Sequence, residues 1–485
     1  MSGRLKNFWN RNGRNVIFLT LIVMTASVPL LTDYLLEGEN LQNVLTRIEL
    51  ISQGLTKSFP VRIQPAALPD YGYGAAAFEA DVFLILPGVL HRMGLSLQAA
   101  YKLYLWAVNI ATAVCSFLCF EKCFHRQELG LLGSLLFTWC PYRLSSLYVA
   151  AQAGEAAAWC FLPLLLLGLV RLYAGEDKQK GVGRTWVLLT AALLLILSAS
   201  MTVFVIAAGM CVLWLFLLGK RALSKDVRLT VGKTVLATGL LGAWFLIPLF
   251  YFVYKNTELL GNLILQDVRS GGLSWAVYLM TFFGAGTSKN FWENGMAGTQ
   301  SLGMGFAVTA CVLFFLWSFF TGRYAQKEKK PLCKRLAVLG LVLAYFSTSS
   351  FPWELLQNKN LLFSLLLGWM QSPAKWGIGA CAVFILLSCE TLYLEREEGW
   401  YRICLGITIS TAFLTAQFLT GEILLSTQPL WLERTEEWAA LPLQVITGIP
   451  WLWRGAEGIS LSALAFLVFM AAKGRMRRGK SVEKV

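Results

Sequence analysis

The sequence predicts an all-α, polytopic integral membrane protein with about twelve transmembrane helices. Hydrophobic residues make up 56% of the 485 residues and charged residues only 14%, whereas a soluble domain carries about 25% charged residues. The mean hydropathy is +0.58, and apolar runs of about 20 residues, the length that crosses a bilayer, recur along the chain. These observations exclude a soluble globular protein.

The first apolar run and the loop that follows it set the order of the expected elements. The run 16–36 follows a basic N-terminus, 1–14, and is too long for a signal-peptide core, so we expect an uncleaved span. The first outer loop is 37–97. Within it, apolar residues at helical spacing predict an amphipathic helix on the outer membrane surface; they are Leu41, Val44, Leu45, Ile48, Ile51 and Leu55.

The remaining apolar runs complete the expected topology. The run 82–90 is too short to cross a bilayer and predicts a short or re-entrant helix. The run 185–218 is too long for one crossing and is divided at 198–202. The expected spans after the first are 98–120, 128–149, 153–173, 185–200, 201–218, 231–254, 302–320, 336–350, 376–395, 403–420 and 456–472.

The basic residues assign the two sides of the membrane. Most of the 42 Lys and Arg residues fall in the N-terminus, the short alternate connectors and the tail 473–485, so both termini are expected in the cytoplasm. The same asymmetry accounts for the net charge of +14 without a nucleic-acid partner. The long loops 37–97 and 255–300 then lie outside. We therefore expect residues 1–485 to form one membrane domain that acts on its extracytoplasmic face.

The sequence contains no recognisable motif for a nucleotide cofactor or a bound metal. The two His residues exclude a multi-His site, and the 11 Cys residues lack zinc-ligand spacing, so we expect the cysteines to pack as small apolar side chains. The chain contains no P-loop or Rossmann fingerprint. Trp353 and Trp376, near the ends of expected spans, are interpreted as interfacial anchors.

Six outer motifs resemble those of a bacterial family of multi-pass membrane proteins in the GT-C glycosyltransferase superfamily. They are RIE at 47–49, FPVRIQP at 59–65, YGYG at 71–74, PYRLSSLYVAAQAGE at 141–155, FPWELL at 351–356 and QSPAKW at 371–376. The resemblance covers most of the chain. It implies sugar transfer from a polyprenyl-phosphate carrier to an envelope glycan or lipid acceptor at the bacterial plasma membrane. It assigns no certain cofactor, although a divalent metal is compatible with it.

The chain departs from the family pattern within these motifs. Asn40 and Val44 stand where the family has Asp and His, and Ser146 and Ala150 stand where it has Asp and Arg. In the last motif, Lys375 lies close to the usual position of Arg. The resemblance therefore leaves the identity of the catalytic base open.

Glycosyl transfer requires a carboxylate that accepts the acceptor's proton. The candidates are Glu37 and Glu39 in the first outer loop and Glu155 near the outer end of a span. The alternative for Glu37 and Glu39 is a solvated helix start, where anions are favoured. The alternative for Glu155 is an acid at a helix N-terminus at the interface.

Transfer also requires cations that neutralise the departing phosphate. The candidates are Arg47, Arg62, Arg143 and Lys375. Headgroup binding or snorkelling is the alternative for Arg47 and Arg62. A structural ion pair with Glu155 is the alternative for Arg143, and ordinary membrane anchoring is the alternative for Lys375.

Two other functions remain open at this point. The four departures favour a non-catalytic relative that binds lipid-linked glycan or a partner enzyme. A secondary transporter is the third candidate because twelve spans with both ends inside suit that class, although the uneven loops and the missing two-half symmetry argue against it.

Overall fold

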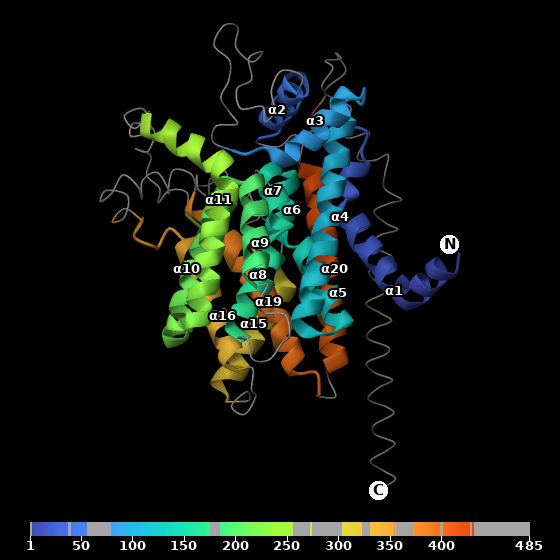
Figure 1. The fold of residues 1–485 in the computed structure, drawn as a ribbon. Helices are drawn as coiled ribbons and strands as arrows, with labels where there is room; N and C mark the ends of the chain where they lie inside the picture. Colours follow the sequence, from blue (N-terminus) through green and yellow to red (C-terminus); the bar gives the residue numbers. More distant parts are fainter. Residues whose placement is uncertain are drawn as a thin grey trace, which may run out of the picture.

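The computed structural model is a bundle of helices that describes residues 2–36, 40–55, 79–174, 185–255, 272–273, 303–322, 330–353, 355, 372–397, 401–426 and 429–430 (Figure 1). The helices of the first half are α1 (Ser2–Ala26), α2 (Leu41–Gly54), α3 (Ile85–Arg92), α4 (Leu97–Phe124), α5 (Gln127–Thr138), α6 (Pro141–Tyr148), α7 (Ala153–Trp159) and α8 (Leu162–Ala174). Those of the second half are α9 (Thr185–Ala199), α10 (Met201–Leu218), α11 (Lys225–Lys255), α15 (Phe306–Phe320), α16 (Lys330–Phe346), α19 (Gly377–Leu394) and α20 (Tyr401–Ser426).

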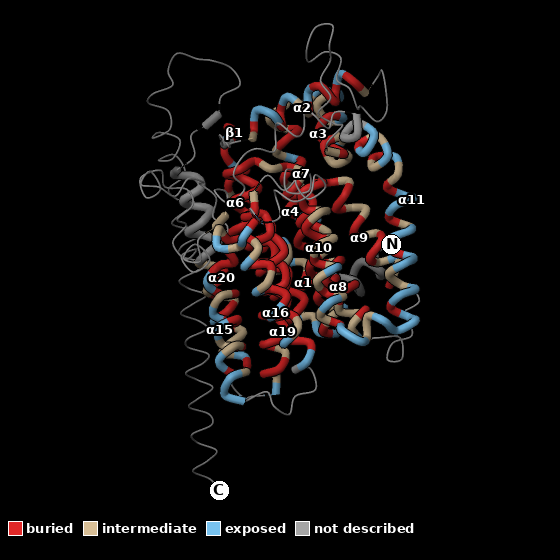
Figure 2. Tube along the Cα trace, turned by 90° about the vertical axis from the view of Figure 1, so that its left-hand side faces the viewer, coloured by how far each residue is buried: buried red, intermediate tan, exposed pale blue. Residues whose placement is uncertain are grey.

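Helix α19 lies at the centre of the bundle and α11 at its edge (Figure 2). The most apolar window of α19 is 94% buried, whereas that of α11 is 28% buried. Helix α19 packs against α5, α8, α10, α15 and α16. A helix that is apolar on all sides suits such a central position.

The first expected span, 16–36, is not one continuous helix. Helix α1 ends at Ala26, and Pro29 lies in a short 3-10 helix, Val28–Leu31, because proline suits the first turn of a helix but not its interior. Helix α2 follows at the upper end of the bundle (Figure 1) and buries Leu41, Val44, Leu45, Ile48 and Ile51, the stripe read from the sequence. Its position on a membrane surface stays a prediction.

A two-residue strand pair closes the same end of the bundle. Strand β1 (Leu35–Leu36) pairs antiparallel with β2 (Pro429–Leu430), so the chain just after α20 meets the chain just before α2. The run 82–90 forms the 3-10 helix η3 (Val82–Leu84) and then α3, which agrees with the short helix expected there.

Prolines lie at helix breaks within two of the expected spans. The expected helix 128–149 is two helices, because α5 ends at Thr138 and Pro141 begins α6. The expected span 153–173 is confirmed as the candidate span Ala153–Ala174, within which α7 is followed by α8 and Pro163 lies in the first turn of α8. The division of 185–218 is confirmed: Ser200 caps α10 by accepting a hydrogen bond from the Val203 amide at 3.5 Å.

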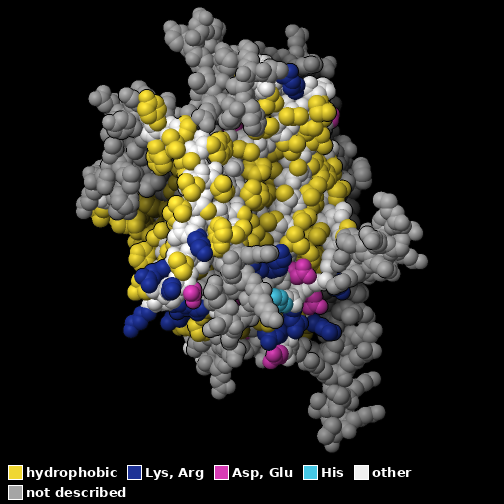
Figure 3. Space-filling view, viewed as in Figure 1, with side chains coloured by type: hydrophobic (Ala, Val, Ile, Leu, Met, Phe, Trp, Pro, Cys, Tyr) yellow, Lys and Arg dark blue, Asp and Glu magenta, His cyan; other side chains and the backbone are white. Residues whose placement is uncertain are grey.

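The face of the bundle seen in Figure 3 is apolar over a broad band. On α11, Val235, Leu236, Leu240, Leu241 and Ile247 are 61–68% exposed, which suits contact with lipid rather than water. Five helical segments are long and apolar enough to cross a membrane: Leu97–Phe124, Ala153–Ala174, Met201–Leu223, Lys225–Tyr251 and Pro373–Leu394.

The chain is therefore described as a multi-pass, all-helical membrane protein. The count of twelve spans stays a prediction, since Phe306–Phe320 and four other apolar helices are shorter than 18 residues. The expected span 456–472, the tail 473–485 and most of the loop 255–300 lie outside the described residues. The cytoplasmic position of the termini also stays a prediction.

Candidate functional site

The turn between α6 and α7 presents Glu155 at the upper end of the bundle. The amides of Val149 and Ala150 both donate to the Ser145 carbonyl at 2.9 Å, and Ala151 has a φ of 51°, a left-handed conformation that costs a residue with a Cβ about 1 kcal/mol or more. The Tyr104 hydroxyl donates to the Ala153 carbonyl at 3.0 Å and fixes the start of α7. Such local strain is often found at functional sites.

Glu155 forms a buried ion pair with Lys375. Its Oε2 lies 2.5 Å from Lys375 Nζ, and its Oε1 accepts a hydrogen bond from the Ser146 hydroxyl at 2.6 Å. The side chains of Lys375 and Glu155 are only 8% and 4% exposed. Lys375 belongs to the 3-10 helix η8 (Pro373–Trp376), whose first turn is capped by Ser372. Two motifs that are 220 residues apart in sequence therefore meet at one carboxylate.

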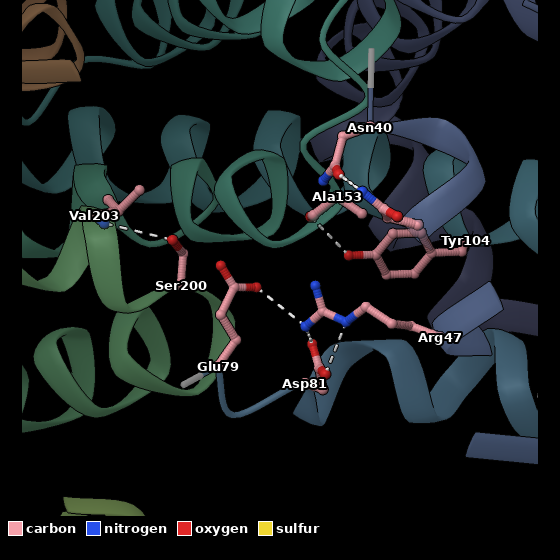
Figure 4. Close-up of polar contacts among 9 residues, drawn as sticks. Asn40, Arg47, Glu79, Asp81, Tyr104, Ala153, Ser200 and Val203 are labelled. Carbon is pink, nitrogen blue, oxygen red and sulfur yellow. Dashed lines mark hydrogen bonds and ion pairs between the residues drawn. The ribbon is translucent and has the colours of Figure 1, made fainter. Parts of the chain in front are cut away.

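Arg47 forms a second charged cluster with Glu79 and Asp81. Arg47 Nε donates to Asp81 Oδ2 at 3.1 Å and Nη2 donates to Glu79 Oε2 at 3.1 Å, while Nη2 also contacts Asp81 Oδ1. Figure 4 shows the guanidinium held between the two carboxylates. The contact joins α2 to the segment before η3. The paired residues are 32 and 34 positions apart in the sequence. Arg47 is thus already neutralised by two acids.

Asp81 is the more buried of the two acids in this cluster. Its side chain is 8% exposed, compared with 30% for Glu79. Burial raises the pKa of the Asp81 carboxyl above its ordinary value, because desolvation outweighs the stabilisation by Arg47. Asp81 also has a φ of 52°, so its backbone is strained as well.

A small polar pocket lies between the two clusters. Glu79 approaches α7 closely: a Cβ added to Gly154 would lie 3.7 Å from Glu79 Oε2 and 2.5 Å from the Ala199 carbonyl oxygen, so only glycine fits there. The space is about 10 Å³, which is roughly room for one water molecule. The pocket is lined by Asn40, Val44, Arg47, Glu79, Leu84, Gln152, Ala153, Gly154, Glu155, Ser200 and Thr202.

The positions that depart from the family pattern all lie at or beside this pocket. Asn40 and Val44 line it. Ser146 holds Glu155, and the Ala150 carbonyl accepts a hydrogen bond from the Asn40 amide at 3.2 Å. The first and second motifs are therefore brought together, and the substituted residues have structural contacts of their own.

Arg143 does not pair with Glu155, which corrects one expectation for this residue. Its side chain is fully buried. It donates to the Thr138 carbonyl at 2.9 Å, to Asn109 Oδ1 at 2.6 Å and to Thr112 Oγ1 at 3.1 Å. It is not among the residues that line the pocket. This arginine joins α4 to the α5–α6 break.

Trp353 and Trp376 are inside the protein rather than at the membrane interface. They are 4% and 8% exposed and stack with ring centroids 6.3 Å apart. Phe346 packs edge-on against both rings, at 5.8 Å and 5.4 Å. The interpretation as interfacial anchors is wrong for these two residues, since their rings are buried against other aromatic side chains and do not face lipid.

Sequence reasoning missed Glu79 and Asp81. The signal was present, because the two acids flank Ala80 where the polar first loop gives way to the apolar run at 82. Three predicted site residues, Glu37, Glu39 and Arg62, lie outside the described residues and stay predictions.

The three carboxylates beside the pocket, Glu79, Asp81 and Glu155, do not fit a divalent metal. Glu79 and Asp81 are bound to Arg47, and Glu155 is bound to Lys375, so each acid already has a cation. Within the described ranges, no group of three or more His, Cys, Asp or Glu residues is arranged to hold a metal. We therefore assign no step of the chemistry to a metal.

No protein-family model matches the sequence, and no curated protein matches it. The chain is similar to the crystal structure of the Archaeoglobus fulgidus oligosaccharyltransferase in the apo form, with a TM-score of 0.51 and 11% identity over 90% of this chain and 60% of that chain. It is also similar to the archaeal oligosaccharyltransferase AglB from Archaeoglobus fulgidus in complex with an inhibitory peptide and a dolichol-phosphate, with a TM-score of 0.45 and 12% identity over 86% and 55% of the two chains.

The first comparison shows that the fold is GT-C-like, as the motifs predict. The chain spans about 60% of the length of that oligosaccharyltransferase. The bacterial origin implied by the motifs stays a prediction.

Proposed function

We propose that this protein is a GT-C-type glycosyltransferase that moves a sugar from a polyprenyl-phosphate carrier to an envelope glycan or lipid acceptor. The convergence of three outer motifs supports this most strongly. Arg47 of α2 and Glu155 of α7 line one polar pocket at the end of a GT-C-like helical bundle, and Lys375 of η8 is ion-paired to Glu155. The solved structure of similar fold is named an oligosaccharyltransferase, which relates this helical bundle to sugar transfer.

The proposed reaction exchanges one bond of the anomeric carbon for another. An acceptor hydroxyl attacks that carbon, its bond to the phosphate oxygen breaks, and polyprenyl phosphate leaves with the electron pair. The hydroxyl proton passes to a carboxylate of the protein. A cation neutralises the charge that develops on the phosphate.

Glu79 is the described carboxylate best placed to accept the proton. It is 30% exposed, and among the described residues its ion pair and hydrogen bond both join Oε2 to Arg47. Glu155 is 4% exposed and both its oxygens are bonded. We therefore propose Glu79 as the base and Glu155 as a positioning residue, with Glu39 and Glu37 kept as predicted alternatives.

Arg47 is the cation that we propose for the phosphate. It lines the pocket, whereas Lys375 is committed to Glu155 and Arg143 is buried elsewhere. The pocket has room for about one water molecule, so a sugar phosphate enters only if Arg47 exchanges a carboxylate for the phosphate. Arg62 stays a predicted second phosphate ligand.

The decisive experiment is a profile of lipid-linked sugars and envelope glycans in a null strain, by mass spectrometry. A sugar missing from the null strain is expected to return with wild type and with Arg92→Gln, and to return poorly with Arg47→Gln. Arg92 is the matched control because it is exposed on neighbouring α3 and, among the described residues, donates only to the Ser52 carbonyl. Loss of the hydrogen bonds to a charged group is expected to weaken donor binding about 10- to 100-fold. An unchanged null profile would count against the proposal.

Acidic pH is expected to tighten donor binding through Asp81. The pKa of Asp81 is raised by burial, so as pH falls it takes up a proton above the usual range for an aspartate. Protonated Asp81 no longer neutralises Arg47, which then keeps only Glu79 as an anionic partner and attracts the phosphate more strongly. Asp81→Asn is expected to bind polyprenyl phosphate about tenfold more tightly at neutral pH and to lose this pH dependence.

Titration of binding against pH checks this expectation. Glu49→Gln is the control, since Glu49 is exposed on α2, the helix that carries Arg47, and its substitution removes the same charge away from the pocket. Equal pH dependence in wild type and Asp81→Asn would show that another group is responsible.

A non-catalytic protein that binds lipid-linked glycan is the second candidate. The observation that favours it is the structural use of all four substituted motif positions, together with the occupied oxygens of Glu155. Donor binding that depends on Arg47 but gives no transfer with any acceptor would select this function over the first.

A further inference from the structure

At the end of the bundle opposite the pocket, two arginines lie against one tyrosine ring. The Arg221 guanidinium carbon is 5.4 Å from the centroid of the Tyr173 ring, and that of Arg335 is 4.9 Å from it. Arg221 belongs to the short helix η6 (Gly219–Leu223) and Arg335 to α16. Tyr173 lies in the last turn of α8, while Glu155 lies at the start of the same crossing segment, Ala153–Ala174.

The Tyr173 ring is held in place by a second aromatic side chain. Tyr173 packs edge-on against Trp214 with ring centroids 6.5 Å apart. Trp214 is fully buried, and its indole nitrogen donates to the Leu169 carbonyl at 3.0 Å. The two arginines are therefore held beside a rigid aromatic platform that joins α8, α10, η6 and α16.

Neither arginine has an acidic partner in the described part of the chain. The ion pairs found there involve Arg47, Lys375 and Arg396. The distances to the common ring place the two guanidinium carbons within about 10 Å of each other, a separation at which like charges still repel. Both side chains are half-buried, which reduces screening by water. An anion beside them would remove that repulsion.

The surroundings indicate that this anion belongs to a lipid. Phe216 and Leu223, on either side of Arg221 in sequence, are 76% and 71% exposed. Figure 3 shows Lys and Arg side chains gathered just below the apolar band of the bundle. A phospholipid combines the two features, since its phosphate suits guanidinium groups and its acyl chains suit an apolar helix face.

We propose that Arg221, Arg335 and Tyr173 form a binding site for the headgroup of an anionic phospholipid, whose acyl chain lies along Phe216 and Leu223. Basic pockets between helices at a membrane surface are known to bind anionic headgroups. None of these residues lines the polar pocket. The proposed lipid site can therefore be tested independently of the proposed sugar transfer.

Native mass spectrometry of the full-length protein in neutral detergent, titrated with phosphatidylglycerol, tests the site. Arg221→Gln/Arg335→Gln is expected to bind phosphatidylglycerol about 10- to 30-fold more weakly than wild type. Lys225→Gln/Arg228→Gln removes the same charge from exposed positions of α11 and is expected to bind like wild type. Phosphatidylcholine is the neutral-lipid control and is expected to bind all proteins equally weakly.

A second variant keeps the test valid if the arginine variant folds poorly. Tyr173→Leu preserves every charge but removes the ring that fixes both arginines, and it is expected to weaken phosphatidylglycerol binding several-fold. Equal losses in the α11 control would show a diffuse charge effect and overturn the site. Binding of inorganic phosphate as tight as that of phosphatidylglycerol would overturn its assignment to a lipid, and wild-type binding by both variants would overturn it altogether.

Discussion

Glu79→Gln is expected to slow sugar transfer by about 10²- to 10⁴-fold, the usual contribution of a general base. The amide has the size of the carboxylate and still offers an oxygen to Arg47, so the ion-paired cluster with Asp81 is retained. It cannot accept the acceptor's proton. Donor binding is therefore expected to change much less than the transfer rate, which separates a catalytic role from a binding role.

The measurement is a transfer assay with a panel of synthetic polyprenyl-phosphate hexoses and null-strain envelope extract as the source of acceptor. Glu49→Gln on α2 is the matched control and is expected to keep the wild-type rate. A wild-type rate in Glu79→Gln would reject Glu79 as the base. Glu155→Gln and Glu39→Gln would then be measured in the same assay, as the sequence-based candidates.

Glu155→Gln and Lys375→Met are each expected to lower the free energy of unfolding by about 3–5 kcal/mol, the cost of leaving a buried charge without its partner. The pair is 4% and 8% exposed, and Ser146 supplies the only other hydrogen bond to Glu155 among the described residues. Glutamine leaves the Lys375 ammonium uncompensated, and methionine leaves the Glu155 carboxylate with one neutral donor. The double variant buries no charge and is expected to lose less than either single variant.

Unfolding of the purified protein in lipid nanodiscs measures this cycle. Glu397→Gln is the control because its pair with Arg396, at 3.2 Å, is on the surface with Glu397 82% exposed. Surface pairs contribute little, so no measurable change is expected there. Additive losses in the double variant would mean that Glu155 and Lys375 do not interact in the folded protein.

Much of the fold follows from the sequence because helix length and the apolar stripe are local properties. The division of 185–218 by Ser200 and the buried stripe of α2 were read from spacing alone. The interruption at Pro141 was missed, since the apolar run 128–149 has the length of a span and hides the break.

The partners of the charged residues could not be read in this way. Arg143 lies in the same motif as Glu155, yet it bonds to Asn109 and Thr112 of α4. Arg47 pairs with Glu79 and Asp81 of the same expected outer loop, at separations of 32 and 34 residues. Helical periodicity predicts contacts only between residues that are close in sequence, so it does not predict these ion pairs.

The sequence by itself determined the membrane class, most helix positions and the outer motifs that gather at one end. Only the tertiary structure decided that Lys375 neutralises Glu155, that Arg47 is shared by two acids and that the pocket between them is nearly closed. The physical reason is that hydrophobic burial follows the periodicity of each helix, whereas charges attract according to their distance in space and the water excluded around them.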